Sequence, residues 1–410
     1  MTTSRSAPGA TFLWFALGLL IISICINYID RGNLSVASSA IQKDFSLDAE
    51  RMGLLLSAFF WTYSTAQLFA GAVIDRFNVN WVYAAGYFLW SGATILTGYT
   101  TGFESLFLLR MVLGLSESVA YPCYSKIIAG GFREEQRGVA NALIDAGSKL
   151  GPAIGIFICA KLLAWRGWQM MFIVIGAVSM LWLIPWIWVA MKQRVEKVEV
   201  KASSISVVDI ITTRAAWGTF LALLCGNYTW YFMLTWLPSY LKNVRHYTDE
   251  TMAIAGSAPF LAVAISSTIC GILSDRWIRG GGSPTRVRKT FAASGLACAA
   301  AFLLPSAMVE DPKISMGLLI CASAAFGMWS SNLWAITQTL AGPGAAGRWT
   351  GLQNAFGNLA GIVAPWLTGW SIKATESYLT GFAIAAGVAA CGAITYAFLL
   401  PQIRPVFDRR

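Results

Sequence analysis

The chain has 410 residues, of which 56% are hydrophobic and only 12% charged, and its mean hydropathy is +0.60. Soluble domains carry about 25% charged residues, so most of this apolar surface must face lipid and a water-soluble fold is excluded. The net charge of +10 lies in short polar segments between apolar ones. This favours anionic lipid headgroups over nucleic acid as the partner of the basic residues.

Twelve apolar segments are long enough to cross a bilayer, which takes about 20 helical residues. They cover residues 12–38, 51–73, 81–100, 104–128, 137–163, 168–190, 216–242, 250–273, 288–308, 313–340, 348–373 and 378–400. The longest polar interruption follows the sixth segment. We predict an all-α membrane protein with twelve transmembrane helices in two pseudo-symmetric bundles. Residues 1–190 form one six-helix bundle, 191–214 a cytoplasmic linker and 215–410 the second bundle.

Basic residues are concentrated in the two tails, the linker and the segments between even-numbered and odd-numbered spans. Basic residues accumulate on the cytoplasmic side of a membrane. The sequence therefore predicts an integral protein of the cytoplasmic membrane with both termini in the cytoplasm.

The pattern Gly-x-x-x-Asp-Arg occurs twice, after the second span of each half. The copies end in Asp75-Arg76 and in Asp275-Arg276. A repeat at matching places indicates a duplicated membrane protein, in which the substrate path lies between the halves. We expect these four residues to act as a cytoplasmic gate.

Charged side chains occur at membrane depth in the first half of the chain. They are Asp30 and Arg31 in span one, Arg110 and Glu117 in span four, and Asp145 and Lys149 in span five. A charge at the bilayer centre costs at least about 2.5–3.5 kcal/mol, so each needs a reason. One reason is transport of a charged substrate, and the alternative is a set of ion pairs that holds the helices together.

Opposite chain directions allow Asp30 and Arg110 to meet at a similar height, so we expect them to pair. Glu117 has no cation one turn away in its own helix. Arg31 is then the free cation, and its planar guanidinium suits a carboxylate. Asp145 and Lys149 are four residues apart, so Lys149 either pairs with Asp145 or binds substrate.

Several uncharged groups could shape the same site. Tyr28 lies on the helix face of Arg31, and Tyr63 and Trp334 are amphipathic side chains in spans two and ten. Ser331 and Trp334 share a face, being three residues apart. Packing is the alternative role for each of these residues.

Enzyme chemistry has no support in the sequence. The one histidine, His246, falls in a predicted loop, and there is no nucleophile–histidine pair or phosphate-binding loop. The eight cysteines lie in apolar segments without metal-ligand spacing, so no metal site is expected. We expect no cofactor, with protons as the coupling ion.

The twelve-span duplicated layout resembles the major facilitator superfamily. Within it, the segment Asn27-Tyr28-Ile29-Asp30-Arg31 and the pattern Arg110-x-x-x-Gly114-x-x-Glu117 are similar to the anion:cation symporter family, which includes bacterial galactonate, glucarate and hexuronate transporters. The resemblance implies the major facilitator fold, a monomer and alternating access of one central site.

The resemblance also implies roles for individual residues. Asp30 and Glu117 would take up protons, Arg31 would bind the substrate carboxylate, and Arg110 would pair with the acid of span one. Residues that match the sugar-acid site of the family are Tyr28, Tyr63, Ser331, Trp334 and Asn354. Lys149 lies in the stretch of span five where those members place a glutamine, and an extra cation there could serve a dianion.

From these observations we expect a proton-coupled symporter that imports a small organic anion, with a hexonate or hexuronate as the expected substrate. The alternatives are an anion exchanger or a symporter of another carboxylate or dianion. A transporter-like sensor is a further alternative, although such proteins usually carry a long soluble extension.

Overall fold

The computed structural model describes residues 10–132, 134–192 and 205–407, and within these ranges the regular structure is helical. We call α1 to α6 the N-half and the later elements the C-half. The N-half contains α1 (Ala10–Asp44), α2 (Ala49–Arg76), α3 (Val79–Thr97), α4 (Phe103–Glu117), α5 (Ala120–Gly131) and α6 (Glu134–Lys192). The C-half contains α7 (Val207–Ile211), α8 (Arg214–Asn243), α9 (Asp249–Ala255), α10 (Ala258–Arg279), α11 (Pro284–Met308), α12 (Pro312–Ser330), α13 (Leu333–Thr375), α14 (Tyr378–Ile394) and the π-helix η1 (Thr395–Leu399).

The helices match the predicted spans once their breaks are considered. Gly167 in α6 has φ 79° and Gly342 in α13 has φ 64°, so each of these helices is two helices joined at a left-handed glycine. Span four is divided into α4 and α5 at Ser118. Pro122 explains this break, because its ring conflicts with the carbonyl four residues earlier.

Seven described helical stretches are apolar and long enough to cross a membrane. One of them covers residues 139–192 and contains two predicted spans, on either side of Gly167. The other predicted spans lie in α2, α3, α8 and the later part of α13, whose sequences are richer in amide, hydroxyl and aromatic groups. The division into bundles at 191–214 remains a prediction, and residues 193–204 of that linker lie outside the described residues.

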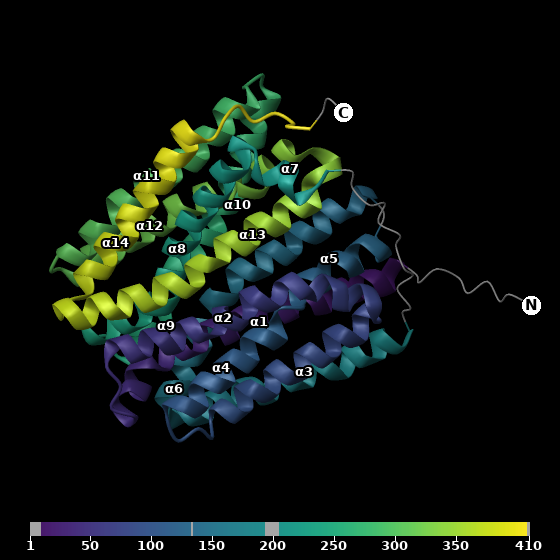
Figure 1. The fold of residues 1–410 in the computed structure, drawn as a ribbon. Helices are drawn as coiled ribbons and strands as arrows, with labels where there is room; N and C mark the ends of the chain where they lie inside the picture. The colour runs from purple at the N-terminus through teal and green to yellow at the C-terminus, as the bar shows by residue number, and fades with distance from the viewer. Residues whose placement is uncertain (1–9, 133, 193–204, 408–410) are drawn as a thin grey trace, which may run out of the picture.

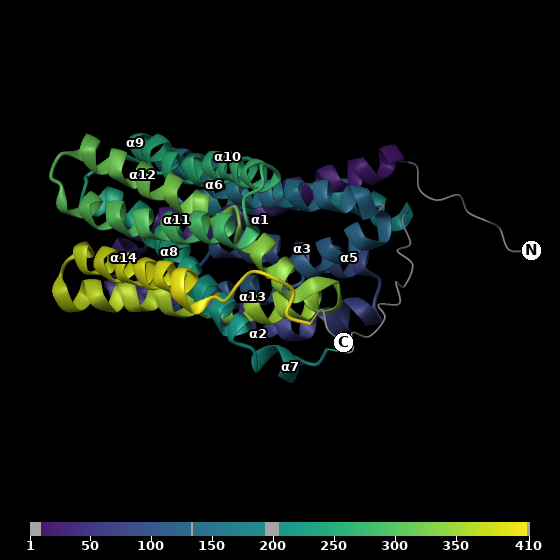
Figure 2. The same ribbon diagram turned by 90° about the horizontal axis from the view of Figure 1, so that it is seen from above.

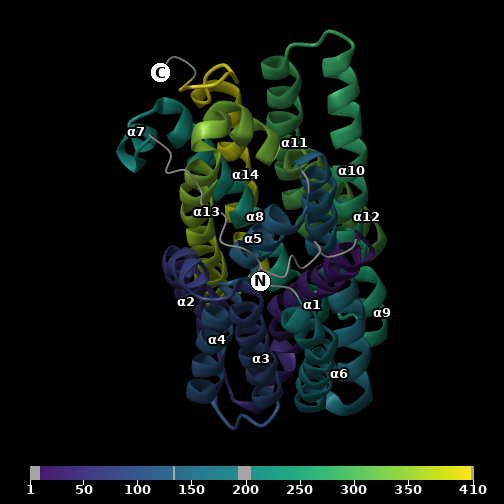
Figure 3. The same cartoon turned by 90° about the vertical axis from the view of Figure 1, so that its right-hand side faces the viewer.

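The two halves lie side by side with their helices running along a common direction (Figure 1). The N-half is drawn from purple to blue-green, and the C-half from teal-green to yellow. The described chain begins and ends at one end of the molecule, which faces the viewer in Figure 3. We call this the termini end and the opposite one the far end.

Glycines on α6 allow it to lie directly against α1. A Cβ at Gly147 would stand 2.6 Å from Ile24, and one at Gly151 would stand 2.7 Å from the Cβ of Tyr28. These glycines therefore serve the packing of α6 on α1. This close contact fixes the part of α1 that carries the charged residues.

Bonds between the two halves join them towards the far end. Ser35 donates to the carbonyl of Thr235 at 2.6 Å, and Ser39 donates to Asn243 at 3.0 Å. Lys373 bridges to the carboxylates of Asp48 at 3.1 Å and Glu50 at 2.6 Å. The far end is therefore closed by contacts between the halves.

Candidate functional site

Four ionisable side chains are buried together in the N-half. Asp30 and Arg31 come from α1, and Arg110 and Glu117 come from α4; none is more than 4% exposed. Two are acids and two are arginines, so the cluster can be neutral as a whole. Buried charges require such pairing, because an isolated ion in an apolar interior is strongly disfavoured.

Arg31 and Glu117 form the ion pair of this cluster. Arg31 Nε donates to Glu117 Oε2 at 3.0 Å, and both side chains are almost fully buried. The expectation that Arg31 is a free cation is therefore wrong. The partner of Glu117 comes from another helix, so the sequence of α4 alone does not indicate it.

Three aromatic rings surround the Arg31 guanidinium. Its Cζ lies 4.5 Å from the centre of the Tyr63 ring, 4.9 Å from Tyr28 and 5.0 Å from Phe59. Cation–π attraction strengthens when water is excluded, so the rings help to hold this charge inside the protein. Sequence patterns indicated Tyr28 and Tyr63 but not Phe59.

Unused hydrogen-bonding atoms remain beside the ion pair. Among the described residues, Arg31 Nη2 and Glu117 Oε1 are buried without a hydrogen-bond partner, as are both side-chain polar atoms of Asn27. Buried polar atoms are normally satisfied, so such a concentration indicates a place where a ligand or water binds.

Asp30 does not pair with Arg110 through its carboxylate in the described contacts. Asp30 Oδ1 accepts from Thr94 Oγ1 at 3.1 Å and from Asn33 Nδ2 at 3.2 Å. Arg110 Nη1 donates to the backbone carbonyl of Asp30 at 3.2 Å. The predicted side-chain pair is thus corrected: Arg110 holds the main chain of α1, while α3 supplies a hydroxyl to the carboxylate.

Lys149 forms an ion pair with Asp145 within α6, at 2.7 Å between Nζ and Oδ2. The side chain of Lys149 is 18% exposed and that of Asp145 is 48% exposed. The pairing alternative is therefore what the structure contains. Whether Lys149 also binds substrate stays a prediction.

A chain of hydrogen bonds runs from Tyr63, one of the rings around Arg31, to the C-half. Gln67 donates to the Tyr63 hydroxyl at 3.1 Å, and Asn358 donates to Gln67 Oε1 at 3.2 Å. Tyr231 then donates to Asn358 Oδ1 at 2.9 Å. Sequence analysis did not identify Gln67, although it lies four residues after Tyr63 on the same helix face.

The predicted residues of the C-half lie on α12 and α13. Ser331 caps α12, donating to the Met328 carbonyl and accepting from Asn332. Trp334 is partly buried against the apolar core of the C-half, and Asn354 is partly buried on α13. Their part in a substrate site stays a prediction.

The predicted gate residues lie at the termini end. Arg76 stands 5.8 Å from the ring of Phe77, its chain neighbour, and Asp275 and Arg276 are exposed. The side chain of Asp75 lies outside the described residues. The gating role therefore stays a prediction.

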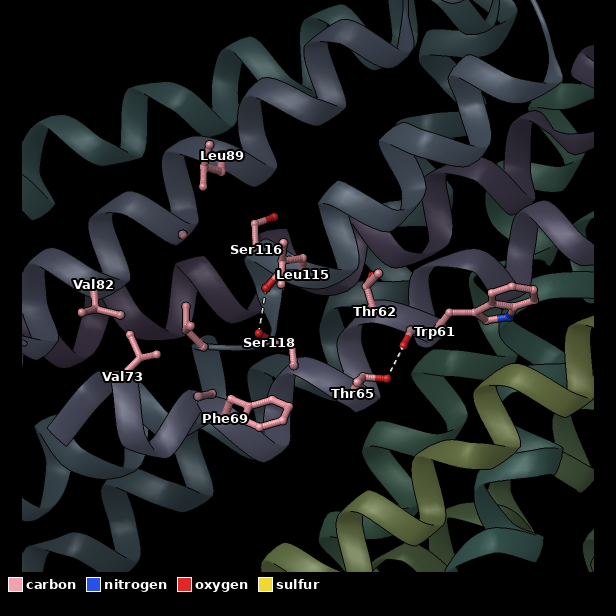
Figure 4. A pocket seen from close by; sticks show the side chains of 14 residues that line it. Trp61, Thr62, Thr65, Phe69, Val73, Val82, Leu89, Leu115, Ser116 and Ser118 are labelled. Atoms are coloured by element: carbon pink, nitrogen blue, oxygen red, sulfur yellow. Dashed lines mark hydrogen bonds between the residues drawn. The ribbon is translucent and has the colours of Figure 1, made fainter. Parts of the chain in front are cut away.

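A cavity of about 580 Å³ opens on the side of the N-half, between α2, α3 and the α4–α5 break (Figure 4). Its walls include the exposed apolar side chains of Phe69, Leu89 and Leu115. The hydroxyls of Thr65 and Ser118 are bonded to carbonyls of their own helices, as the dashed lines show. None of the described residues that line this groove is charged, and none belongs to the arginine cluster.

Two halves of long apolar helices, with a buried charged cluster in the N-half, are typical of a membrane transport protein. The sequence matches the family model of the Major Facilitator Superfamily over residues 20–365. The chain therefore belongs to the Major Facilitator Superfamily, whose fold has twelve spans; it is an integral membrane transporter, not an enzyme.

Relatives match along almost the whole chain. It is 31% identical to the uncharacterized transporter YybO of Bacillus subtilis, covering 97% of this chain and 96% of the relative. It is 28% identical to a probable L-galactonate transporter of Escherichia coli, covering 96% and 90%. It is also 28% identical to a probable galactarate/D-glucarate transporter of Bacillus subtilis, covering 96% and 93%. These matches confirm the predicted likeness to galactonate and glucarate transporters.

A solved structure supports the fold independently. A bacterial homolog of the human lysosomal transporter Spinster, in an inward-facing and unoccupied conformation, superposes with a TM-score of 0.78. It covers 96% of both chains at 15% sequence identity. At that identity the similarity establishes the fold alone.

Proposed function

We propose that this protein is a proton-coupled symporter that imports a sugar acid, a hexonate or hexuronate, by alternating access. The observation that carries the proposal is the Arg31–Glu117 pair: a buried guanidinium inside three aromatic rings, with one unused donor. Its relatives include proteins named as galactonate and galactarate/D-glucarate transporters. Arg31 presents a planar fork that matches a carboxylate.

The pairing of Arg31 with Glu117 supports a coupling mechanism. A substrate carboxylate and Glu117 compete for the same guanidinium. When Glu117 is protonated, the pair loses its negative charge and Arg31 can hold the substrate anion instead. Proton binding and anion binding then favour each other, as a symporter requires.

Asp30 is the second proposed proton site. Its carboxylate is fully buried with hydroxyl and amide donors, and Arg110 holds the adjacent main chain. A protonation change at Asp30 would alter the electrostatic field on Arg110 and on Arg31, the next residue.

We take the functional unit to be a monomer.

The described conformation fits one state of this cycle. With both termini in the cytoplasm, the far end faces outside and its contacts between the halves close the site to that side. We assign the structure to the state closed to the outside. Import then requires these contacts to open before an anion enters.

Binding to purified protein tests the substrate class directly. Galactonate, glucarate, glucuronate, glutamate and glycerol phosphate would be titrated by calorimetry. One sugar acid should bind, and Arg31→Lys should weaken it about tenfold or more, because the planar fork is lost. Arg51→Lys is the matched control, since Arg51 is exposed and lies 5.8 Å from the Phe103 ring. Equal binding to wild type and Arg31→Lys would overturn the role of Arg31.

A further inference from the structure

Helices α2 and α13 form the long contact between the halves, and they lie next to each other in Figure 2. Gly53 packs against α13 so closely that a Cβ there would stand 2.6 Å from the carbonyl oxygen of Pro365. Phe60 packs on Gly361 in the same way. Gly53, Phe60 and Gln67 follow at intervals of seven residues, so they share one face of α2.

Among the described bonds between α2 and α13, the one from Asn358 to Gln67 lies nearest the termini end. One residue earlier on α13, Gly357 packs on Leu223 and Asn227 of its own half. The Lys373 bridges to Asp48 and Glu50 are at the far end of the same two helices. The Gln67–Asn358 pair and the Lys373 bridges therefore hold α2 and α13 together at two separate places along their contact.

Both amides of the pair use their oxygen and their nitrogen in described hydrogen bonds. Gln67 bonds to Tyr63 on its own helix, and Asn358, which is 4% exposed, accepts from Tyr231. Neither side chain has a buried atom left without a partner. The pair is therefore a built connection, not a chance contact of two polar groups.

Tyr63 ties this connection to the arginine cluster. Its hydroxyl accepts from Gln67, while its ring centre lies 4.5 Å from Arg31 Cζ. Arg31 in turn is bonded to Glu117. A change in the partner of Arg31 therefore acts on Tyr63, and Tyr63 acts on the bond between the halves.

We infer that Gln67 and Asn358 are positioning residues that hold the site closed to the outside, and that Tyr63 makes this closure depend on what Arg31 binds. The inference deepens the proposed function, because α2 and α13 must separate whenever the site opens outward. The bond between Gln67 and Asn358 is lost at that step. It contributes to closure without contacting substrate.

The test measures how often the outer side opens. Ala49→Cys places a thiol at the start of α2, where the Ala49 carbonyl meets Gly369. Its labelling rate by a membrane-impermeant maleimide would be followed in proteoliposomes, with the unsubstituted protein correcting for the native cysteines. Gln67→Leu and Asn358→Leu should each raise the rate about fivefold, as expected for loss of the one hydrogen bond that joins the halves at this point.

Three further variants separate this role from a general loss of packing. The double variant should raise the labelling rate by less than the product of the two single effects, because both single variants remove the bond between Gln67 and Asn358. Exchanging the amides, Gln67→Asn with Asn358→Gln, should restore slow labelling. Gln353→Leu is the matched control, since Gln353 accepts a buried hydrogen bond from Thr337 within the C-half, and its rate should stay within about twofold.

Unchanged labelling in both single variants, or effects that add in the double variant, would overturn the inference. The assay without substrate does not depend on the proposed cargo. The sugar acids could fail to alter labelling of the Ala49→Cys protein while the Leu variants still accelerate it. In that case the proposed substrate is wrong, and the role inferred for Gln67 and Asn358 is upheld.

Discussion

Arg31 donates through Nε to Glu117 at 3.0 Å, and its Nη2 remains without a described partner. The same guanidinium thus serves an internal carboxylate and has donor capacity left for a second one. Direct competition between Glu117 and a substrate carboxylate explains how one proton can prepare one anion site.

Replacing Glu117 by glutamine mimics the protonated acid permanently. We expect uptake driven by a proton gradient to fall about tenfold or more, while exchange of preloaded substrate stays within about threefold. Radiolabel flux in proteoliposomes measures both. Glu104→Gln, an exposed acid at the start of α4, is the control and should change neither. Gradient-driven uptake that survives in Glu117→Gln would remove Glu117 from the coupling mechanism.

Lys149 should matter less than Arg31 for a substrate with one charge, because Asp145 already neutralises it. Lys149→Gln is expected to leave galactonate uptake within about twofold. Asp145→Asn leaves Lys149 unpaired, and it should increase uptake of the dianion glucarate relative to galactonate. A collapse of galactonate uptake in Lys149→Gln would instead place Lys149 in the substrate site.

The contact of α6 with α1 tolerates no side chain at Gly151. Its Cβ would stand 2.7 Å from Tyr28 Cβ and 2.9 Å from the Cys25 carbonyl oxygen, so α1 must shift. Gly151→Ala is expected to cost about 1–3 kcal/mol and to weaken anion binding through Tyr28. Thermal unfolding and calorimetry measure the two effects. Gly18→Ala, with nothing within 4 Å of the added Cβ, should change neither.

Asp48 caps α2 and accepts from the Arg51 backbone N–H at 2.8 Å. That hydrogen bond, with help from Lys373, holds the pKa of Asp48 below its usual range. A lowered pKa means that the ionised cap stabilises the protein above about pH 4, the ordinary aspartate value, and that this stabilisation is lost as pH falls through the lower folded-state pKa.

Asp48→Ala should therefore lower the unfolding temperature at pH 7, with a cap worth about 1 kcal/mol. The difference from wild type should shrink as pH falls below about 4. Asp48→Asn keeps a capping oxygen and should be intermediate at pH 7. A difference that is the same at pH 3 and pH 7 would contradict the role of the ionised carboxylate.

The fold could be predicted from sequence because hydrophobic length is a strong constraint in a membrane. The breaks at Gly167 and Gly342 separate spans that the hydropathy pattern had already separated. Which residues belong to the charged cluster was also predictable, since charges at membrane depth are rare.

Their pairing could not be predicted, because it depends on the rotation of one helix against another. Glu117 finds Arg31 on α1, and Asp30 finds Thr94 on α3, at sequence separations of 86 and 64 residues. Gln67 and Asn358 lacked any charge or motif that would mark them. Their importance follows from the contact of α2 with α13, which only the fold reveals.

Uptake into proteoliposomes tests the central claim most directly. Galactonate, glucarate, glucuronate, glutamate and glycerol phosphate would each be supplied with and without an inward proton gradient. The account predicts that a sugar acid accumulates and that the gradient increases its accumulation. If no anion accumulates under the gradient, while preloaded anion exchanges freely, the protein is an exchanger and the proton roles of Glu117 and Asp30 are wrong.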